Sequence, residues 1–384
     1  MSVSKPGIKS KLPNVGTTIF TVMSALAGEC NAINLSQGFP DFDSPPDLID
    51  LVNSYMKQGM NQYAPMQGIL PLRIQIADKI KSIYNVEYDP HSEINICSGG
   101  TQAIYTAITA SIREGDEVIV LEPAYDCYIP AIQLSGGVAV CIPLEGPDFK
   151  VDWTIVRKAM TYRTRMIIIN TPHNPAGTAF SNEDFLELER ITRETEILIL
   201  SDEVYEHILF DGNKHLSVMQ YQGLKERSFV VFSFGKTYHT TGWKMGYCLA
   251  PENLMSEFRK VHQFVVFTSN TPIQYALTEY LKNKSYLELP AFFQEKRDYF
   301  LNLISGSRFN FKPSAGSYFQ LLDYSNITRE KDTDFAVRLT KEFGVASIPV
   351  SVFYQKPTKA KLLRFCFAKN KETLEKAAES LLKV

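Results

Sequence analysis

Residues 228–246 read SFVVFSFGKTYHTTGWKMG and hold the features that decide the fold. Residues 228–232 are a run of β-branched and aromatic side chains, which predicts a buried strand. Lys236 follows this strand among small and hydroxylic residues, at the place where α/β folds carry reactive groups. A lysine amine can form a Schiff base with a carbonyl group, while Ser233 and Lys244 suit a phosphate. Alone, the stretch is also compatible with a surface lysine, because short motifs discriminate loosely.

The composition is that of a large globular protein. The chain has 384 residues, of which 45% are hydrophobic, and this length favours two domains. Its 40 basic and 42 acidic residues give a net charge of -2 without blocks of like charge, so we expect no nucleic acid and no membrane surface as partner. Six scattered cysteines predict free thiols, and we identify neither a signal region nor an apolar stretch of membrane-spanning length. We therefore expect a cytoplasmic protein.

Further apolar runs predict more strands of the same sheet. They cover residues 94–97, 117–121, 138–143, 166–170 and 197–200. Hydrophobicity in these runs is continuous rather than alternating, which indicates that both faces of each strand are covered. The predicted fold class is therefore α/β, with a mostly parallel sheet flanked by helices. Helical spacing predicts helices at 17–27, 46–57, 70–84, 272–281, 289–304, 332–343 and 371–382.

Polar and small residues collect where these strands end. The strand at 94–97 leads into a glycine turn at 99–100 and a helix, whose free N–H groups and positive dipole end suit a phosphate; an ordinary tight turn is the alternative. Other strand ends are followed by Tyr125, Asn174, Asp202, Tyr205 and Lys236. Tyr125 either stacks on a planar ring or fills an edge of the core. Because ligands of open parallel sheets lie beyond the carboxyl ends of the strands, the sequence predicts one binding site at this edge.

The pattern changes near residue 271, where long helical segments precede short strands at 318–322 and 362–367. This predicts a second, smaller α+β domain. We expect residues 1–40 to form an N-terminal arm and part of the small domain, 41–280 the large domain, and 281–384 the small C-terminal domain. Arg364 lies between apolar neighbours in a predicted strand. A half-buried arginine normally holds an anion, either a ligand or the carboxylate of a structural salt bridge.

Taken in chain order, these motifs resemble those of the fold-type I pyridoxal phosphate aminotransferases, the aspartate aminotransferase superfamily. The segments SQGFPDF (36–42), NTPHNPAG (170–177) and SDEVYEH (201–207) look like the branch of bacterial methionine aminotransferases and kynurenine–glutamine aminotransferases. The likeness runs from about residue 12 to the C-terminus. It implies a seven-stranded sheet in a large cofactor-binding domain, a homodimer with shared active sites, and pyridoxal 5′-phosphate as cofactor.

The resemblance also implies a role for each motif residue. Lys236 would be the catalytic residue and hold the cofactor as a Schiff base, with Asp202 paired to the pyridine nitrogen. Other residues would contact the ring hydroxyl (Asn174, Tyr205), the ring face (Tyr125) or the phosphate (Gly100, Thr101, Ser233, Lys244, and Tyr63 from the neighbouring subunit). The α-carboxylate of the substrate would lie against Gly38, Asn174 and Arg364, and its side chain against Ile19, Phe20, Tyr63, Tyr125 and, from the neighbouring subunit, Phe267. Lys244 departs from the aspartate aminotransferases, which carry arginine there; lysine keeps the charge but loses the bidentate fork.

The implied enzyme is an aminotransferase that moves the amino group of an apolar or aromatic amino acid to a 2-oxo acid. Methionine is the favoured donor, and phenylalanine, tyrosine, glutamine and kynurenine are further candidates, because the implied pocket is apolar and no second arginine for a distal carboxylate is identifiable. A cysteine-conjugate β-lyase, an amino-acid decarboxylase and a non-enzymatic regulator domain are the alternatives. The six histidines show no ligand spacing, so we expect no metal.

Overall fold

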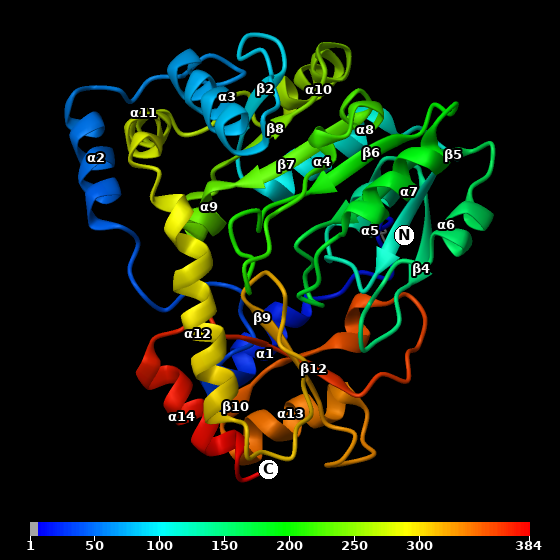
Figure 1. Ribbon diagram of the computed structural model, residues 1–384, viewed down its shortest axis with the longest axis vertical. Coiled ribbons are helices and arrows are strands. Elements are labelled where there is room, and N and C mark those ends of the chain that lie inside the picture. Colours follow the sequence, from blue (N-terminus) through cyan, green and yellow to red (C-terminus); the bar gives the residue numbers. More distant parts are fainter. Residues whose placement is uncertain (1–6) are drawn as a thin grey trace, which may run out of the picture.

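Seven strands form the main sheet, in the order β2-β8-β7-β6-β5-β3-β4 (Figure 1). The structure, a computed structural model, describes residues 7–384, so the first six residues of the predicted N-terminal arm lie outside it. The strands are β2 (Ile94–Cys97), β3 (Glu117–Glu122), β4 (Val138–Pro143), β5 (Thr164–Asn170), β6 (Leu198–Asp202), β7 (Ser228–Ser233) and β8 (Gly246–Leu249). Only β8 is antiparallel to its neighbours, β2 and β7; the other pairs of this sheet are parallel. The predicted α/β fold with a mostly parallel, seven-stranded sheet is confirmed.

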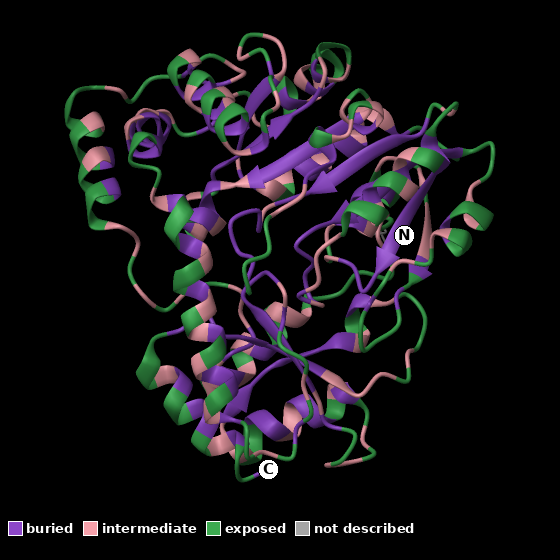
Figure 2. Cartoon of the chain, viewed as in Figure 1, coloured by how far each residue is buried: buried purple, intermediate pink, exposed green. Residues whose placement is uncertain are grey.

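Side chains of the central strands alternate between two hydrophobic cores, one on each face of the sheet. In β7, Val230 and Phe232 belong to one core, whereas Phe229 and Val231 belong to the other. The first core includes side chains of α3 (Leu70–Tyr84) and α7 (Asn182–Thr192), and the second includes side chains of α4 (Gly100–Ser111) and α10 (Glu252–Val265). This double coverage explains why the apolar runs are continuous, and Figure 2 shows the central strands as buried.

The other helices agree with the predicted helical spacing or connect the strands. They are α1 (Ile19–Glu29), α2 (Pro46–Lys57), α5 (Tyr128–Leu134), α6 (Trp153–Ala159), α8 (Gln222–Lys225), α9 (Phe234–Thr237), α11 (Thr271–Tyr280), α12 (Leu289–Leu303), α13 (Asp332–Phe343) and α14 (Lys371–Leu381). Helix α1 begins two residues later than predicted, because the Thr18 side chain accepts the amide of Thr21 and so caps the helix at Ile19.

Two smaller sheets lie below the main sheet in Figure 1. One is antiparallel, in the order β11-β12-β9, with β9 (Phe319–Asp323), β11 (Ile348–Pro349) and β12 (Leu362–Cys366). The other pairs β1 (Ile33–Asn34) in parallel with β10 (Val345–Ala346). The long helix α12 runs from the level of the main sheet to these smaller sheets. Across residues 7–384, no helix combines the length and apolarity needed to span a bilayer.

Candidate active site

A cavity of about 190 Å³ lies at the carboxyl edge of the main sheet. The loops that follow the strands form one wall, and residues 37–38 with β9 and β12 contribute the other. Most of the predicted site residues line it: Phe20, Gly38, Gly100, Thr101, Tyr125, Asn174, Asp202, Tyr205, Ser233, Lys236, Lys244 and Arg364. The fold therefore brings motifs from the whole length of the chain to one place.

Lys236 lies in α9, directly after β7, with its amine at the cavity wall. Its Nζ donates hydrogen bonds to the Tyr318 hydroxyl at 2.8 Å and to the backbone oxygen of Gly38 at 3.2 Å. The pKa of Lys236 is lowered to about 8, mainly by burial and also by the nearby cations Arg364 and Lys244, while Cys366 and Asp202 act in the opposite direction. With such a pKa about a tenth of the amine is neutral at pH 7, far more than for a solvated lysine.

Asp202 is the last residue of β6 and is buried. The Tyr128 hydroxyl donates to its Oδ2 at 2.5 Å, and the Val204 amide donates to Oδ1 at 3.4 Å. Burial raises the pKa of Asp202 to about 6, although these two donors favour the charged form. Asn170 connects this strand end to the next, because its Nδ2 donates to the Asp202 backbone oxygen at 2.8 Å while its Oδ1 accepts the Asn174 amide at 2.8 Å.

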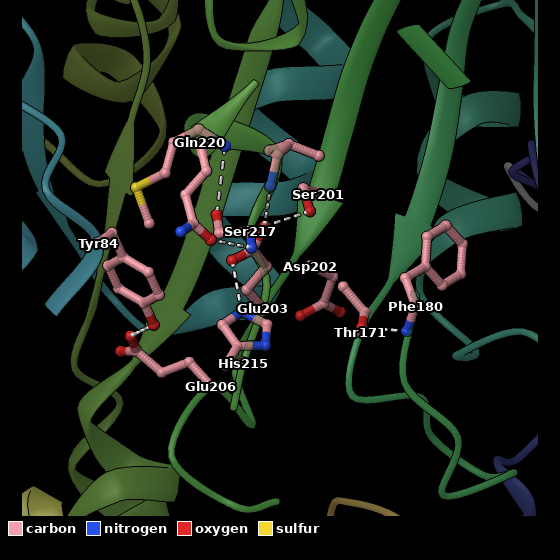
Figure 3. Close-up of polar contacts among 12 residues, drawn as sticks. Tyr84, Thr171, Phe180, Ser201, Asp202, Glu203, Glu206, His215, Ser217 and Gln220 are labelled. Atoms are coloured by element: carbon pink, nitrogen blue, oxygen red, sulfur yellow. Dashed lines mark hydrogen bonds and ion pairs between the residues drawn. The ribbon is translucent and has the colours of Figure 1, made fainter. Parts of the chain in front are cut away.

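A buried network of charged and polar groups, part of which Figure 3 shows, surrounds the segment that follows Asp202. Glu203 accepts the Ser201 hydroxyl at 2.7 Å and pairs with His215 Nε2 at 2.8 Å. Glu206 pairs with Lys79, and its other oxygen accepts the Tyr84 hydroxyl at 2.7 Å. We call this set the Glu203–Glu206 network; it comprises Lys79, Tyr84, Ser201, Glu203, Glu206, His215 and Tyr247, whose hydroxyl accepts from Lys79 at 2.9 Å. Tyr205 lies between the two glutamates in sequence, so the network fixes its backbone at the cavity.

The part of the cavity wall at the start of helix α4 is suited to an anion. Helix α4 begins there after Gly99, whose φ of 84° is readily adopted only by glycine. A Cβ added to Gly99 would lie 3.3 Å from Lys244 Nζ, so the lysine amine lies close to this helix start. Two hydroxyl side chains also line the cavity: Thr101, which follows the glycine turn, and Ser233, the last residue of β7. Free backbone N–H groups, hydroxyls and an ammonium are the groups that bind phosphate.

Arg364 lies in β12 with 1% of its surface exposed. Its guanidinium donates to Asn174 Oδ1 at 2.9 Å and to the backbone oxygen of Ser36 at 2.8 Å, and it lies over the rings of Phe319 at 3.9 Å and Phe20 at 5.1 Å. Within residues 7–384, no carboxylate forms an ion pair with it, and its Nε has no partner. Burial lowers the pKa of Arg364 to about 10. Within the described residues Arg364 therefore forms no structural salt bridge, which leaves the guanidinium available for an anion in the cavity.

Three predicted pocket residues do not line the cavity of this chain. Ile19 packs half-buried against the hydrophobic core. Tyr63 is 83% exposed and Phe267 is 44% exposed, and their rings contact each other at 5.4 Å between centroids. Because the resemblance places Tyr63 in the site of a neighbouring subunit, the roles of these residues stay predictions.

Sequence reasoning did not find Tyr128, Asn170 and Tyr318, which contact the predicted residues directly. Asn170 ends strand β5 and opens the quoted segment NTPHNPAG, so the strand-end rule could have found it. Tyr128 and Tyr318 carry no such signal, because their partners lie 74 and 82 positions away in the chain.

Comparison with known proteins identifies the family. The family model described as "Aminotransferase class I and II" matches residues 31–381. The chain belongs to the class I and II aminotransferases. Methionine aminotransferase of Escherichia coli (strain K12) is 50% identical over 375 residues, 97% of each chain, and kynurenine–oxoglutarate transaminase 1 of Rattus norvegicus is 30% identical over 410 residues, 97% of each chain. The solved structure of YbdL from Escherichia coli, described with a methionine aminotransferase function, has a TM-score of 0.97 at 49% identity and covers 99% of this chain and 100% of that one.

This aminotransferase uses pyridoxal 5′-phosphate, as the enzymes of its family do. The cavity fits that group in its donor set. It offers an amine with a lowered pKa for the aldehyde, a buried carboxylate for the ring nitrogen, and the N-terminus of α4 with Lys244 for the phosphate. The comparisons favour neither the β-lyase nor the regulator alternative.

Proposed function

We propose that this aminotransferase transfers the amino group of an apolar or aromatic amino acid, with methionine preferred, to a 2-oxo acid. The surroundings of Arg364 carry this proposal. The guanidinium has no carboxylate partner in the described chain and is enclosed by the rings of Phe20, Phe319 and Phe353 at 5.1, 3.9 and 5.6 Å. An α-carboxylate reader beside apolar rings suits an amino acid whose side chain is apolar. The E. coli relative named methionine aminotransferase supports the same choice.

The same cavity supports a role for each cofactor-binding residue. We assign Lys236 to covalent attachment through the cofactor's aldehyde, Asp202 to the ring nitrogen, Asn174 and Tyr205 to the ring hydroxyl, Tyr125 to the ring face, and Gly100, Thr101, Ser233 and Lys244 to the phosphate. When bound, the cofactor delocalises the electron pair left on the substrate's Cα. A charged Asp202 favours the protonated ring nitrogen that this delocalisation needs.

The chain's own residues then position the substrate and move a proton. Arg364 and Asn174, with the backbone of Gly38, hold the α-carboxylate, and this fixes the direction of the Cα–H bond. Lys236 Nζ, once free, takes the proton from Cα as a neutral amine, for which its lowered pKa of about 8 is suited. The Cα proton is therefore within the reach of a base whose working range includes neutral pH.

We also propose a homodimer that shares its active sites and works in the cytoplasm. The exposed aromatic side chains Tyr63, Phe264 and Phe267 support the first part, because they would be covered by a second copy. The six cysteines are all free, which suits a reducing compartment. The separation of the seven-stranded sheet from the three-stranded sheet supports the division into a large domain at 41–280 and a small domain at 281–384. The pairing of β1 with β10 supports the assignment of part of residues 1–40 to the small domain.

A panel of amino donors against several 2-oxo acids tests the proposed specificity. We expect kcat/KM for methionine to exceed the value for phenylalanine, glutamine, kynurenine and aspartate, and aspartate to be the poorest donor, because no other arginine among the described cavity-lining residues can take its second carboxylate. Aspartate as the best donor would contradict the proposal. Pyruvate release from a cysteine conjugate measures β-lyase activity in the same protein, and faster release than methionine transamination would favour that alternative.

A pair of neighbouring substitutions tests the pocket itself. Phe20→Ala removes a ring that lines the cavity, so we expect kcat/KM for methionine to fall about tenfold or more. Ile19→Ala is the matched control, because Ile19 packs on the core and does not line the cavity. Equal losses in the two variants would mean that the predicted role of Ile19 is right and that the pocket extends beyond the described cavity.

A further inference from the structure

Tyr318 lies beside Lys236 and is not among the residues that line the cavity. It is fully buried, directly before β9. Its hydroxyl accepts a hydrogen bond from Lys236 Nζ at 2.8 Å and donates one to the backbone oxygen of Gly38 at 2.6 Å. Lys236 Nζ also donates to that Gly38 oxygen at 3.2 Å. The amine, the hydroxyl and the carbonyl oxygen therefore form a closed triangle of hydrogen bonds.

The chemistry of the three groups fixes the direction of each bond. A backbone oxygen cannot donate, so the single proton of the Tyr318 hydroxyl belongs to the bond with Gly38. Towards Lys236 the hydroxyl is therefore an acceptor. A neutral amine has two N–H bonds and one lone pair. With both N–H bonds directed to the two oxygens, the lone pair of Lys236 is left for the cavity whose wall the lysine forms.

The surrounding side chains leave this triangle little freedom. The ring of Tyr318 contacts Tyr205 edge-on at 5.2 Å and Phe293 at 5.8 Å between centroids. A Cβ added to Gly38 would lie 2.6 Å from Phe319 Cζ, so the backbone packs tightly against β9 at the point where it supplies its oxygen. Both acceptors are thus held by packing on elements other than the one that carries the lysine.

We propose that Tyr318 is a positioning residue for the transamination reaction, which acts through Lys236 by holding the free amine with its lone pair toward the substrate's Cα. This rests on the proposed function of Lys236 as the group that carries the cofactor and moves the proton. An amine whose lone pair is already directed toward the substrate's Cα spends a larger fraction of its conformations in the reactive orientation. The tyrosine therefore raises the rate of the proton transfer without contacting the substrate.

The triangle has a consequence that can be measured without cofactor or substrate. An oxygen acceptor stabilises the ammonium form, so removing it lowers the pKa of Lys236 below about 8. The other groups that face this amine come from several elements: Asp202, Tyr205, Lys244, Arg364 and Cys366. They are unchanged in a Tyr318→Phe variant, which removes only the hydroxyl. Tyr324→Phe is the matched control, because Tyr324 is equally buried and its hydroxyl donates to the Glu330 backbone oxygen at 3.1 Å.

The test is the titration of Lys236 in cofactor-free protein. Trace acetylation with acetic anhydride over a pH series, quantified for the Lys236 peptide by mass spectrometry, gives the midpoint for each protein. We expect Tyr318→Phe to lower the midpoint by about one pH unit, which is roughly fivefold faster acetylation at pH 7, and Tyr324→Phe to leave it in place. An unchanged or raised midpoint in Tyr318→Phe, or the same shift in both variants, overturns the proposal.

Turnover of the reconstituted enzyme gives the second readout. We expect kcat of Tyr318→Phe to fall about tenfold or more while KM for the best donor changes less than about threefold, and an unchanged kcat overturns the proposal. If the protein shows no transaminase activity, the proposed function fails while the titration still decides the role of Tyr318. Should Tyr318→Phe fail to fold, 3-fluorotyrosine at this position keeps the shape with a weaker acceptor; a smaller shift of the midpoint in the same direction is expected, and no shift overturns the proposal.

Discussion

The chain buries two groups of charged side chains near the end of β6: the Glu203–Glu206 network and the cavity that holds Lys236 and Arg364. The two groups differ in whether their charges have partners of opposite charge. In the Glu203–Glu206 network, each carboxylate pairs with a basic group. Glu206 pairs with Lys79, and Glu203 pairs with His215 at 2.8 Å, the second of which Figure 3 shows. In the cavity, the hydrogen-bond partners of Lys236 and Arg364 within residues 7–384 are neutral oxygens and a hydroxyl.

The difference separates what serves the fold from what serves the reaction. A buried charge without a counterion is costly, so a set of charges that pairs internally needs nothing from outside the chain. Among the described residues 7–384, Lys236, Arg364 and Asp202 of the cavity have only neutral hydrogen-bond partners, which leaves their charges available for the opposite charges of a bound cofactor and substrate. The four predictions below test this contrast.

Replacing Lys236 in the cavity should abolish the reaction but not the fold. We expect Lys236→Ala to reduce turnover by roughly 10⁴-fold or more, the upper range for loss of a general acid–base group, and to remove the absorbance of the covalently attached cofactor. The free energy of unfolding of the cofactor-free protein should stay equal or rise, because an unpaired buried cation is lost. Turnover at the wild-type rate would contradict the mechanism, and strong destabilisation would contradict the contrast.

Replacing Lys79, the lysine of the Glu203–Glu206 network, should destabilise the fold. Lys79→Met leaves Glu206 buried without its cation, so we expect the free energy of unfolding to fall by about 3–5 kcal/mol in urea denaturation of the cofactor-free protein. The double variant Lys79→Met/Glu206→Leu removes both charges and should recover most of this loss. A single variant as stable as the double variant would show that the pair is not what stabilises this region.

Arg364→Lys keeps the charge but loses the planar fork that reaches Asn174 and Ser36. We expect kcat/KM for the best amino donor to fall about a hundredfold, which corresponds to the loss of one charge-assisted hydrogen bond to the substrate carboxylate. Arg338→Lys is the control, since Arg338 forms a partly exposed pair with Glu330 and should change kcat/KM less than about twofold. Equal effects in the two variants would speak against a carboxylate site at Arg364.

The smallest expected effect is a shift in the pH dependence of cofactor affinity. Asp202 has a pKa of about 6 in the cofactor-free protein, so its charged form is lost as the pH falls through 6 and cofactor affinity should fall with it. Tyr128 donates to the carboxylate, which lowers the pKa; Tyr128→Phe should therefore move the fall in affinity to higher pH, by about one unit. Cofactor titrations over a pH series measure this. Tyr84→Phe, which removes a donor to Glu206 in the network, should leave the curve unchanged.

Much of the fold follows from local sequence patterns. The helices at 46–57 and 70–84 begin and end where the spacing of apolar residues predicts. Many of the residues that line the cavity were predicted from their positions directly after strands. Strand β8 was not predicted, because its four residues form a strand only through pairing with β2 and β7. Short strands depend on neighbours that a local pattern does not contain.

The parts of the site that were missed depend on distant contacts. Lys79 follows Asp78 in an amphipathic helix and would be read as exposed, yet its partner Glu206 lies 127 positions further along the chain. Ile19 and Phe20 are adjacent in α1, and both were predicted in the pocket, but only Phe20 lines the cavity. Successive residues of a helix face different directions, so only the packing of α1 decides which of the two reaches the site.

The segment 36–38 connects the positions of two cations of the cavity, Arg364 and Lys236. The backbone oxygen of Ser36 holds Arg364, and the backbone oxygen of Gly38 holds Lys236. Carbonyl oxygens are the same in every residue type, so this spacing depends on the path of the main chain, which the tight contact between Gly38 and Phe319 restricts. An engineered insertion or deletion of one residue between positions 36 and 38 would change the distance between the two backbone oxygens, and with it the relative positions of Arg364 and Lys236. The Gln37 side chain anchors this segment to α1, because its Nε2 donates to the Phe20 backbone oxygen at 2.9 Å and to the Ser24 hydroxyl at 2.7 Å.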